Sequence, residues 1–226
     1  MGITPFLVCP FFINKRGIMD LNNKRILILG DSITEGALAT SIEKSFVGRL
    51  KNEYKLDVIN YGVGGTRIAR QRHHVYGCTM YDYDFNLRLT AMESEADIII
   101  VFGGTNDYGH GDSSFYGDDE YSFEGALKIL CAGIKKKYPT SRVLFLTPLQ
   151  RIGVDRPIDH SLEEFASMIK NEALSNGFDV LDLYNDKDFI AGTKSFSEKI
   201  SPDNLHPNDL GHEALASKIY KKLLSM

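Results

Sequence analysis

Five short apolar runs recur along the chain, separated by longer segments of mixed character. They are RILILG (25–30), LDVINYG (56–62), DIIIVFGG (97–104), RVLFLTP (142–148) and FDVLDLY (178–184). The first, third and fourth are almost continuous in aliphatic residues, which is typical of strands buried on both faces of a parallel sheet. The pattern therefore predicts five parallel strands.

Between these runs, apolar residues recur at intervals of three or four, and this spacing predicts helices. Ser161 and Glu164 have the spacing of a capping box, and so do Thr40 and Glu43. Pro207 suits the first position of the C-terminal helix. Strands and helices that alternate in this way predict a three-layer α/β/α sandwich with right-handed crossovers.

The length of 226 residues suits one large domain, which we expect to span residues 19–226. The segment before it contains the apolar run ITPFLVCPFFI (3–13). Two prolines interrupt this run, no basic residue precedes it, and no small-residue cleavage pattern follows it, so it does not resemble a signal peptide. We expect residues 1–18 to form an N-terminal arm that packs on its own domain or on a second subunit of a homo-oligomer.

Composition narrows the classes of partner. The net charge is −4, and both signs are spread along the chain, without the basic cluster of a nucleic-acid-binding protein. No apolar stretch has the length needed to span a bilayer. Cys9, Cys78 and Cys131 form no C-x-x-C pair and are odd in number, which argues against a disulfide framework or a zinc site. We therefore expect a cytoplasmic protein with no nucleic-acid partner and no membrane span.

Polar or glycine-rich segments follow four of the five runs. Asp31-Ser32 follows the first run, GVGGTR (62–67) the second and GGTND (103–107) the third, while SPDNLHPND (201–209) lies beyond the fifth. In open parallel sheets, sites form beyond the carboxyl ends of the strands. We therefore expect a serine, a glycine turn, an asparagine and an Asp-x-x-His sequence to meet at one edge of the sheet.

These residue types fit nucleophilic catalysis on a small-molecule ester. The hydroxyl of Ser32 needs a base to take its proton, and His206 can act as that base. Asp203, three residues earlier, can fold back onto the far ring nitrogen of His206 and fix its tautomer. Attack on a carbonyl creates an oxyanion, for which the Ser32 N–H, an N–H of the glycine turn and the Asn106 amide are candidate donors. The scheme needs no metal and no other cofactor.

The same segments, in the same order, resemble a known superfamily. GDSI (30–33), NYGVGG (60–65), GTND (104–107) and DNLHP (203–207) are similar to the four sequence blocks of the SGNH hydrolases, the GDSL-type esterases and lipases. The resemblance covers the chain from about residue 25 to its end. It implies a flavodoxin-like sandwich and the metal-free, cofactor-free hydrolysis of esters.

The resemblance also implies roles for individual residues. The residues carried over are the catalytic triad Ser32, Asp203 and His206 and the oxyanion-hole donors Ser32, Gly65 and Asn106. Thr66 follows Gly65 where many members of the superfamily carry an acidic residue. The choice between Gly64 and Gly65 as the donor of the glycine turn therefore stays open.

Each motif has a simpler explanation when it is taken alone. Asp31-Ser32 after a strand is often just a helix cap, and the glycine turn is often only a tight turn. Their joint occurrence beyond the right strands favours a hydrolase site. The alternative from another class is a flavodoxin-like protein that binds a phosphate or a flavin without catalysis. GDSITEG (30–36) lacks the glycine-rich phosphate pattern, however, and its acidic Asp31 and Glu35 would repel a phosphate.

Two stretches, 67–96 and 105–121, show neither strand nor helix patterns, and we expect both to be functional loops. The first contains His73-His74 and Asp82 with Asp84, which could be taken for a metal site. Adjacent histidines usually diverge and no pair has i, i+4 spacing, so we interpret this segment as a solvated loop without metal.

Aromatic rings in these loops suggest a substrate class. The rings are Tyr76, Tyr81, Tyr83, Phe85, Tyr108, Phe115 and Tyr116. Amphipathic rings among polar groups, with few Leu, Ile or Val, suit a short acyl ester on a polar carrier such as a sugar. We therefore expect acetyl esters, with a carbohydrate as the carrier, and keep a long-chain or lysophospholipid hydrolase as the alternative. The competing interpretation is that several of these rings only pin the loops to the domain.

Overall fold

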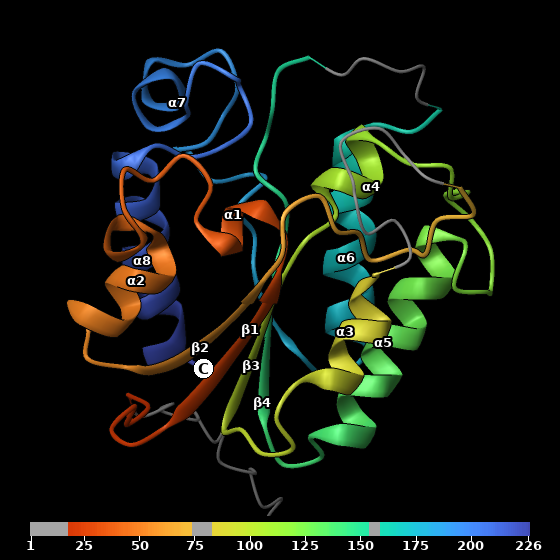
Figure 1. Cartoon of the computed structure of the whole chain (residues 1–226), viewed down its shortest axis with the longest axis horizontal. Helices are drawn as coiled ribbons and strands as arrows, with labels where there is room; N and C mark the ends of the chain where they lie inside the picture. The colour runs from red at the N-terminus through yellow and green to blue at the C-terminus, as the bar shows by residue number, and fades with distance from the viewer. Residues whose placement is uncertain (1–17, 74–82, 154–158) are drawn as a thin grey trace, which may run out of the picture.

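The sheet has five parallel strands in the order β2-β1-β3-β4-β5 (Figure 1). A computed structural model describes residues 18–73, 83–153 and 159–226 of the chain. The strands are β1 (Arg25–Gly30), β2 (Asp57–Gly62), β3 (Ile98–Phe102), β4 (Arg142–Leu146) and β5 (Asp179–Leu181). The predicted five-stranded parallel sheet is confirmed, although β3, β4 and β5 end before their apolar runs do.

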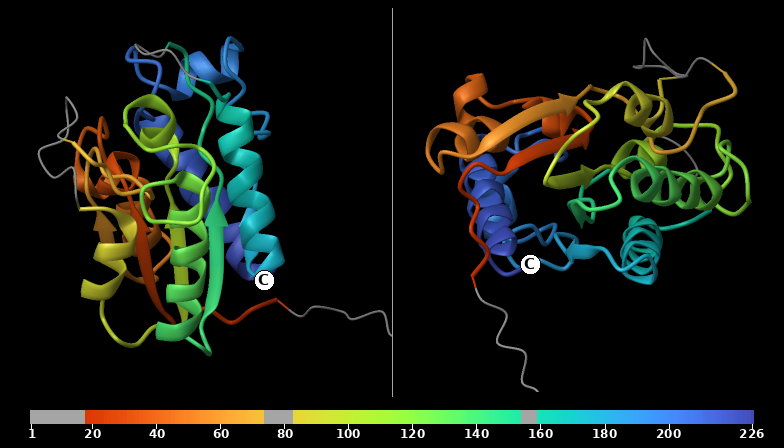
Figure 2. Two further views of the ribbon diagram at one scale, coloured as in Figure 1. Left: turned by 90° about the vertical axis from the view of Figure 1, so that its right-hand side faces the viewer. Right: turned by 90° about the horizontal axis from the view of Figure 1, so that it is seen from below.

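Helices cover both faces of the sheet (Figure 1, Figure 2). On one face lie α2 (Phe46–Asn52) and α8 (Asp209–Leu224), and on the other lie α3 (Phe85–Ala91), α5 (Phe123–Lys137) and α6 (Leu162–Ser175). The shorter elements are α1 (Ser32–Glu35), the 3-10 helix η1 (Ile42–Lys44), α4 (Thr105–Gly109) and α7 (Lys194–Lys199). This is the predicted three-layer α/β/α sandwich.

The central strand β1 shows why its apolar run is continuous. Ile26 and Ile28 pack with α2 and α8, whereas Leu27 and Leu29 pack with α3 and α5. All four side chains are fully buried. Because successive side chains of a strand point to opposite faces, a strand covered on both faces must be apolar at every position.

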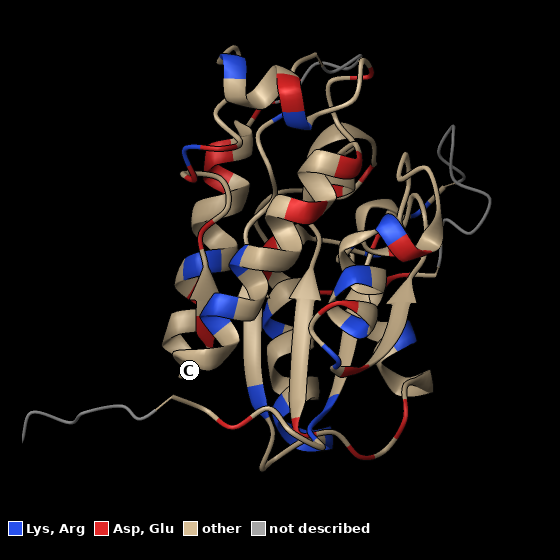
Figure 3. Cartoon of the chain, turned by 90° about the vertical axis from the view of Figure 1, so that its left-hand side faces the viewer, with Lys and Arg blue, Asp and Glu red and all other residues tan. Residues whose placement is uncertain are grey.

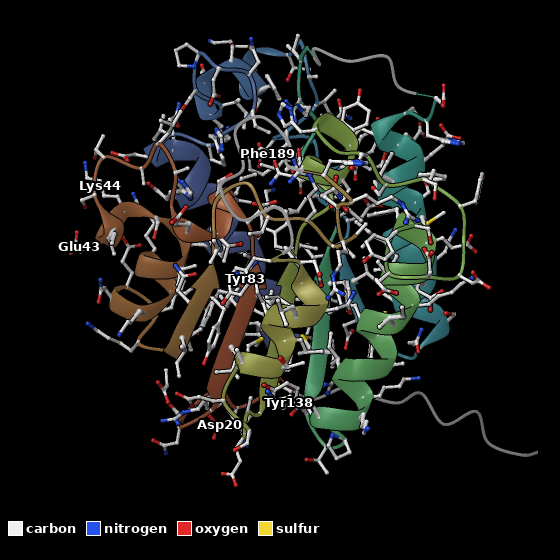
Figure 4. The ribbon with its side chains drawn as sticks, turned by 45° about the vertical axis from the view of Figure 1, so that its right-hand side comes forward. Asp20, Glu43, Lys44, Tyr83, Tyr138 and Phe189 are labelled. Carbon is white, nitrogen blue, oxygen red and sulfur yellow. The ribbon has the colours of Figure 1, made fainter. Side chains whose placement is uncertain are left out.

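Two of the three predicted helix starts are wrong, and one is confirmed. The capping box of Ser161 and Glu164 is present at the start of α6. Thr40 and Glu43 do not cap α2, because the side chain of Ser45 accepts the Gly48 N–H there instead. Glu43 lies on η1, at the outer edge of the molecule (Figure 4).

The start of α8 explains both errors. Pro207 lies before the helix, and the side chain of Asn208 caps it by accepting the N–H groups of Leu210 and Gly211. Asp209, the first helical residue, accepts the N–H and the hydroxyl of Thr40, both at 2.8 Å. Thr40 is therefore engaged by a distant helix and is not available as a cap for its own segment.

Each of the two stretches predicted as loops contains a helix. Residues 67–96 contain α3, whose N-cap Asp84 accepts the N–H of Leu87 at 2.9 Å, and 105–121 contain α4. The arm predicted at residues 1–18 lies outside the described residues except for Ile18, which is exposed. The next residue, Met19, already donates its N–H to the carbonyl of Leu224 at the end of α8.

Charged residues of both signs are distributed over the helices and loops (Figure 3). Several form ion pairs between elements, such as Lys222 with Asp179 at 3.0 Å. Within the described ranges, no helix is both long and apolar enough to cross a membrane.

Candidate active site

Ser32 is held where β1 turns abruptly into α1. A Cβ on Gly30 would collide with the side chain of Thr34, so the turn requires a glycine. Asp31 caps α1 by accepting the Ile33 N–H at 3.0 Å. Ser32 is thus the first helical residue and is half-buried at the carboxyl end of the sheet.

His206 and Asp203 come from the loop before α8 and reach the same place. The Ser32 hydroxyl oxygen lies 2.8 Å from Nε2 of His206, and Nδ1 of His206 lies 2.6 Å from a carboxylate oxygen of Asp203. The other carboxylate oxygen of Asp203 accepts the N–H groups of Leu205 and His206 at 3.0 Å and 2.9 Å. The three side chains predicted to meet therefore form one hydrogen-bonded chain.

The electrostatics of Asp203 keep it charged. Partial burial would raise the pKa of Asp203, but the hydrogen bonds from the His206 ring and from the N–H groups of His206 and Leu205 outweigh burial and lower this pKa. A carboxylate that stays ionised can fix the Nδ1 proton of the imidazole and leave Nε2 free to accept a proton from Ser32.

The glycine turn that follows β2 lies beside Ser32. Val63 donates its N–H to the Gly30 carbonyl at 3.1 Å, and Thr66 closes the turn on the Val63 carbonyl at 3.4 Å. Gly65 has φ of 74°, a left-handed conformation that a side chain would strain. A Cβ on Gly64 would lie 3.7 Å from the Cβ of Ser32.

The two glycine N–H groups of the turn differ in their hydrogen bonding. The Gly64 N–H donates to the carboxylate of Glu35 at 3.0 Å. The Gly65 N–H has no partner among the described residues, and the same holds for the Ser32 N–H. This difference favours Gly65 over Gly64 as a donor to a bound group.

Asn106 is the second residue of α4 and is 5% exposed. Its side-chain amide donates one proton to the Thr66 carbonyl at 3.0 Å. A carboxamide nitrogen carries two protons, so this bond fixes the orientation of the amide and leaves a second proton to donate. Asn106 therefore connects the GTND segment (104–107) to the glycine turn.

Arg88 is a buried cation beneath the site that the sequence does not reveal. It is 3% exposed, and its guanidinium donates to the Gly30 carbonyl at 3.0 Å, to the Thr66 hydroxyl at 2.7 Å and to the Tyr61 carbonyl. It thus ties the ends of β1 and β2 to the glycine turn. The only signal for its helix in the sequence is Asp84, a residue type that often caps helices, followed by two apolar residues four positions apart. The stretch that contains them was predicted as a loop, so Arg88 was missed.

Two buried carboxyl groups support the same region. Burial and the charge of Asp107 together raise the pKa of Asp31 to about 7, against the opposing effects of the Ile33 N–H and of Arg88. Burial also raises the pKa of Asp107, to about 6, although its carboxylate accepts the N–H groups of Ile68 and Ala69. Both groups hold backbone next to Ser32 and Asn106.

The residues weighed for a metal site are separate in the structure. His73 hydrogen-bonds to Asp112 at 2.8 Å, whereas Asp84 caps α3 and pairs with Arg70 at 2.7 Å. His74 and Asp82 lie outside the described residues. In the part of the chain that the structure describes, no group of three or more His, Cys, Asp or Glu side chains is arranged to hold a metal ion.

The aromatic rings divide between core and surface. Phe85 is fully buried under the sheet, and the rings of Tyr108 and Phe115 pack against Phe165 of α6 with centroid distances of 5.8 Å and 4.7 Å. Tyr116 is 62% exposed. Tyr76 and Tyr81 lie outside the described residues, and Tyr83 is half-buried. The interpretation that several rings pin the loops holds for Phe85, Tyr108 and Phe115.

Comparison with known proteins gives a family match and several similar folds. The sequence model of the GDSL-like lipase/acylhydrolase family matches residues 28–214. A comparison with curated protein sequences gives no match. Among solved structures, a protein from Lactobacillus plantarum has a TM-score of 0.74 at 30% identity, over 88% of this chain and 96% of that one.

Two further structures share the fold at lower identity. An acetyl xylan esterase has a TM-score of 0.64 at 24% identity, over 88% of this chain and 99% of that one. A lipase/acylhydrolase from Enterococcus faecalis has a TM-score of 0.65 at 21% identity, over 88% of this chain and 95% of that one.

Proposed function

Because this chain belongs to the GDSL-like lipase/acylhydrolase family, we propose that it hydrolyses carboxylic esters with Ser32 as the nucleophile. One observation carries the proposal. The Ser32 hydroxyl, the His206 ring and the Asp203 carboxylate form an unbroken hydrogen-bonded chain with distances of 2.8 Å and 2.6 Å. A serine hydroxyl is a weak nucleophile on its own, and a base oriented by a carboxylate activates it.

The reaction proceeds in two halves. Ser32 Oγ attacks the ester carbonyl carbon while Nε2 of His206 takes the hydroxyl proton, and Asp203 stabilises the imidazolium that forms. His206 then gives the proton to the departing alcohol, which leaves an acyl ester on Ser32. Water attacks this ester by the same route and releases the acid.

The negative charge that develops on the carbonyl oxygen needs donors already in place. The Ser32 N–H, the Gly65 N–H and the second amide proton of Asn106 are the proposed donors. Arg88 and the Thr66 carbonyl hold the turn and the Asn106 amide in position through the hydrogen bonds described above. Donors fixed before substrate binds need no reorganisation during the reaction.

The preferred substrate is a short acyl ester, such as an acetyl ester, on a polar carrier such as a carbohydrate. The groups that flank Ser32 are polar: the Glu35 carboxylate, the Gly64 backbone and the His206 ring. A long acyl chain would need a broad aliphatic lining. A similar fold occurs in an acetyl xylan esterase, which is consistent with this substrate class.

A phosphate- or flavin-binding function is the less suitable alternative. The Asp31 carboxylate already accepts the Ile33 N–H of α1, and Glu35 accepts the Gly64 N–H of the neighbouring turn. Both carboxylates occupy N–H groups that an anion would need.

The test of the substrate class is kcat/KM for 4-nitrophenyl esters from acetate to palmitate. We expect a maximum at acetate and a fall of about tenfold or more by octanoate, since a longer chain would desolvate the polar groups beside Ser32 without replacing their hydrogen bonds to water. The concentrations of the longer esters are corrected for their low solubility. The fall in kcat/KM should remain after this correction, as a higher KM or a lower kcat. A maximum at long chains, or robust lysophospholipase activity, would refute the short-acyl assignment and leave the Ser32 mechanism intact.

A further inference from the structure

The carboxylate of Glu35 lies beside the proposed nucleophile, and the reaction scheme above does not use it. Glu35 is the last residue of α1, one turn after Ser32, and its side chain is exposed. Residues three apart in a helix project from the same side. Glu35 and Ser32 therefore face the same neighbour, the glycine turn after β2.

The contacts of this turn with Glu35 are close. The Gly64 N–H donates to Oε2 of Glu35 at 3.0 Å. A Cβ on Gly64 would lie 2.8 Å from that oxygen and 3.7 Å from the Cβ of Ser32, and a Cβ on Gly62 would collide with the Glu35 backbone. The carboxylate and the serine thus flank the same glycine.

Glu35 has few other interactions. α1 is a single turn, and it ends directly after Glu35 at Gly36, which has φ of 108°. Within the described residues, Glu35 forms no ion pair. Its hydrogen bond to the glycine turn is therefore its main interaction.

Resting on the proposed esterase function, we infer that Glu35 is a positioning and specificity-determining residue. By accepting the Gly64 N–H, it fixes the turn so that the adjacent Gly65 N–H is the one presented to the oxyanion. By its negative charge, it disfavours esters that carry an anionic group close to the reacting carbonyl.

The positioning role follows from the flexibility of the turn. Gly64 and Gly65 are adjacent glycines, which have more backbone freedom than any other residue pair. The turn is held at its ends by Val63 and Thr66. In its middle, the Glu35 carboxylate accepts the Gly64 N–H, and the Arg67 guanidinium donates to the Gly65 carbonyl at 3.0 Å. A hydrogen bond to a charged acceptor is stronger than one between neutral groups, so it suits this purpose.

The specificity role follows from the charge. Burial lowers the pKa of Arg88, and nearby acidic groups that include Glu35 act in the opposite direction, so the field of the Glu35 carboxylate reaches the base of the site. A second negative charge placed on the substrate within several ångströms would be repelled, by an amount that corresponds to about tenfold in kcat/KM.

Three substitutions separate the two roles. Glu35→Gln keeps an oxygen that can accept the Gly64 N–H but removes the charge. Glu35→Asp keeps the charge but is shorter by one methylene and does not reach Gly64. Glu35→Ala removes both. The matched control is Glu43→Ala, which removes another exposed glutamate at the outer edge of the molecule (Figure 4).

The assay compares two esters whose acyl groups have four carbons, 4-nitrophenyl butyrate and the anionic 4-nitrophenyl hemisuccinate. We expect Glu35→Ala and Glu35→Asp to lower kcat for the butyrate by about tenfold to a hundredfold with little change in KM, since one oxyanion donor loses its alignment. Glu35→Gln should retain kcat within about threefold. Glu35→Gln and Glu35→Ala should raise the ratio of kcat/KM for hemisuccinate over butyrate by about tenfold, and the increase should shrink at high salt.

Several results would overturn this inference. Unchanged kcat in Glu35→Asp and Glu35→Ala, or a loss confined to KM, excludes the positioning role. An unchanged hemisuccinate-to-butyrate ratio in Glu35→Gln excludes the specificity role. If the wild type is active and all Glu35 variants behave like Glu43→Ala, the inference about Glu35 is refuted and the esterase function stands. If the wild type hydrolyses no ester and does not react with a fluorophosphonate, the esterase function is refuted as well.

Discussion

Asp31 should make the stability of the fold depend on pH in an unusual direction. Its carboxyl group is 2% exposed and caps α1 directly before Ser32. Burial raises its pKa from the ordinary value of 3.8 to about 7. Between these two pH values the folded protein binds a proton that the unfolded chain has lost, so stability falls as pH rises.

The magnitude follows from the size of the shift. The contribution of Asp31 is fully present below the unfolded pKa and is lost as pH rises through the folded pKa. A shift of about three pKa units corresponds to about 4 kcal/mol in total, of which about 3 kcal/mol is lost between about pH 5 and pH 9. Asp31→Asn removes the ionisation and keeps an oxygen that can accept the Ile33 N–H.

The assay is urea unfolding of the wild type and of Asp31→Asn at several pH values across this window. All other ionisable groups are common to both proteins, and the effects of those that do not interact with Asp31 cancel in the difference between the two free energies of unfolding; Asp107, whose charge raises the pKa of Asp31, is the exception. We expect the wild type to lose about 3 kcal/mol relative to Asp31→Asn from the acidic to the alkaline end. A difference that stays constant with pH would refute the raised pKa of Asp31.

Three further predictions concern the site. Asn106→Ala should lower kcat by about two to three orders of magnitude with a smaller effect on KM, because its amide binds the oxyanion; a pure KM effect in steady-state kinetics would make it a substrate-positioning residue. Arg88→Met should lower the free energy of unfolding by about 3 kcal/mol in urea, because it leaves buried acceptors at Gly30, Tyr61 and Thr66 without their donor; an unchanged urea midpoint would contradict this. Esterase activity should be insensitive to EDTA, because the proposed mechanism uses no metal; loss on chelation and recovery with zinc would refute the metal-free mechanism.

The sequence could predict where these side chains lie because each has its place near a strand end. Ser32 lies two residues after β1 and Asn106 four residues after β3, and the parallel sheet brings those ends to one edge. Asp203 and His206 are three residues apart, so a local loop is enough to bring them together. Sequence patterns specify such features because they depend on neighbours in the chain.

Features that depend on distant partners could not be predicted. The Thr40 hydroxyl is bound by Asp209, 169 residues away, so the local capping pattern of Thr40 has no effect. Arg88 is buried only because three acceptors from other segments surround its guanidinium. Phe85 belongs to the core, although its surroundings in the sequence are those of a polar loop.

The prediction of the substrate class also depends on tertiary contacts that the sequence does not reveal. Three of the aromatic rings that suggested a substrate class pack on the core and on α6. These rings are Phe85, Tyr108 and Phe115. The polar groups next to Ser32 now provide the stronger argument for a short acyl group. One of these polar groups is the carboxylate of Glu35, which accepts the Gly64 N–H at 3.0 Å.

The central claim is that Ser32 is a nucleophile activated by His206 and Asp203, and covalent labelling tests it most directly. The protein is incubated with a fluorophosphonate, digested, and analysed by mass spectrometry to locate the adduct. We predict one adduct on Ser32, no labelling of Ser32→Ala, and labelling of His206→Ala slowed by several orders of magnitude, with both variants folded. Labelling of Ser32→Ala at the wild-type rate, or an adduct on another residue, would contradict the account.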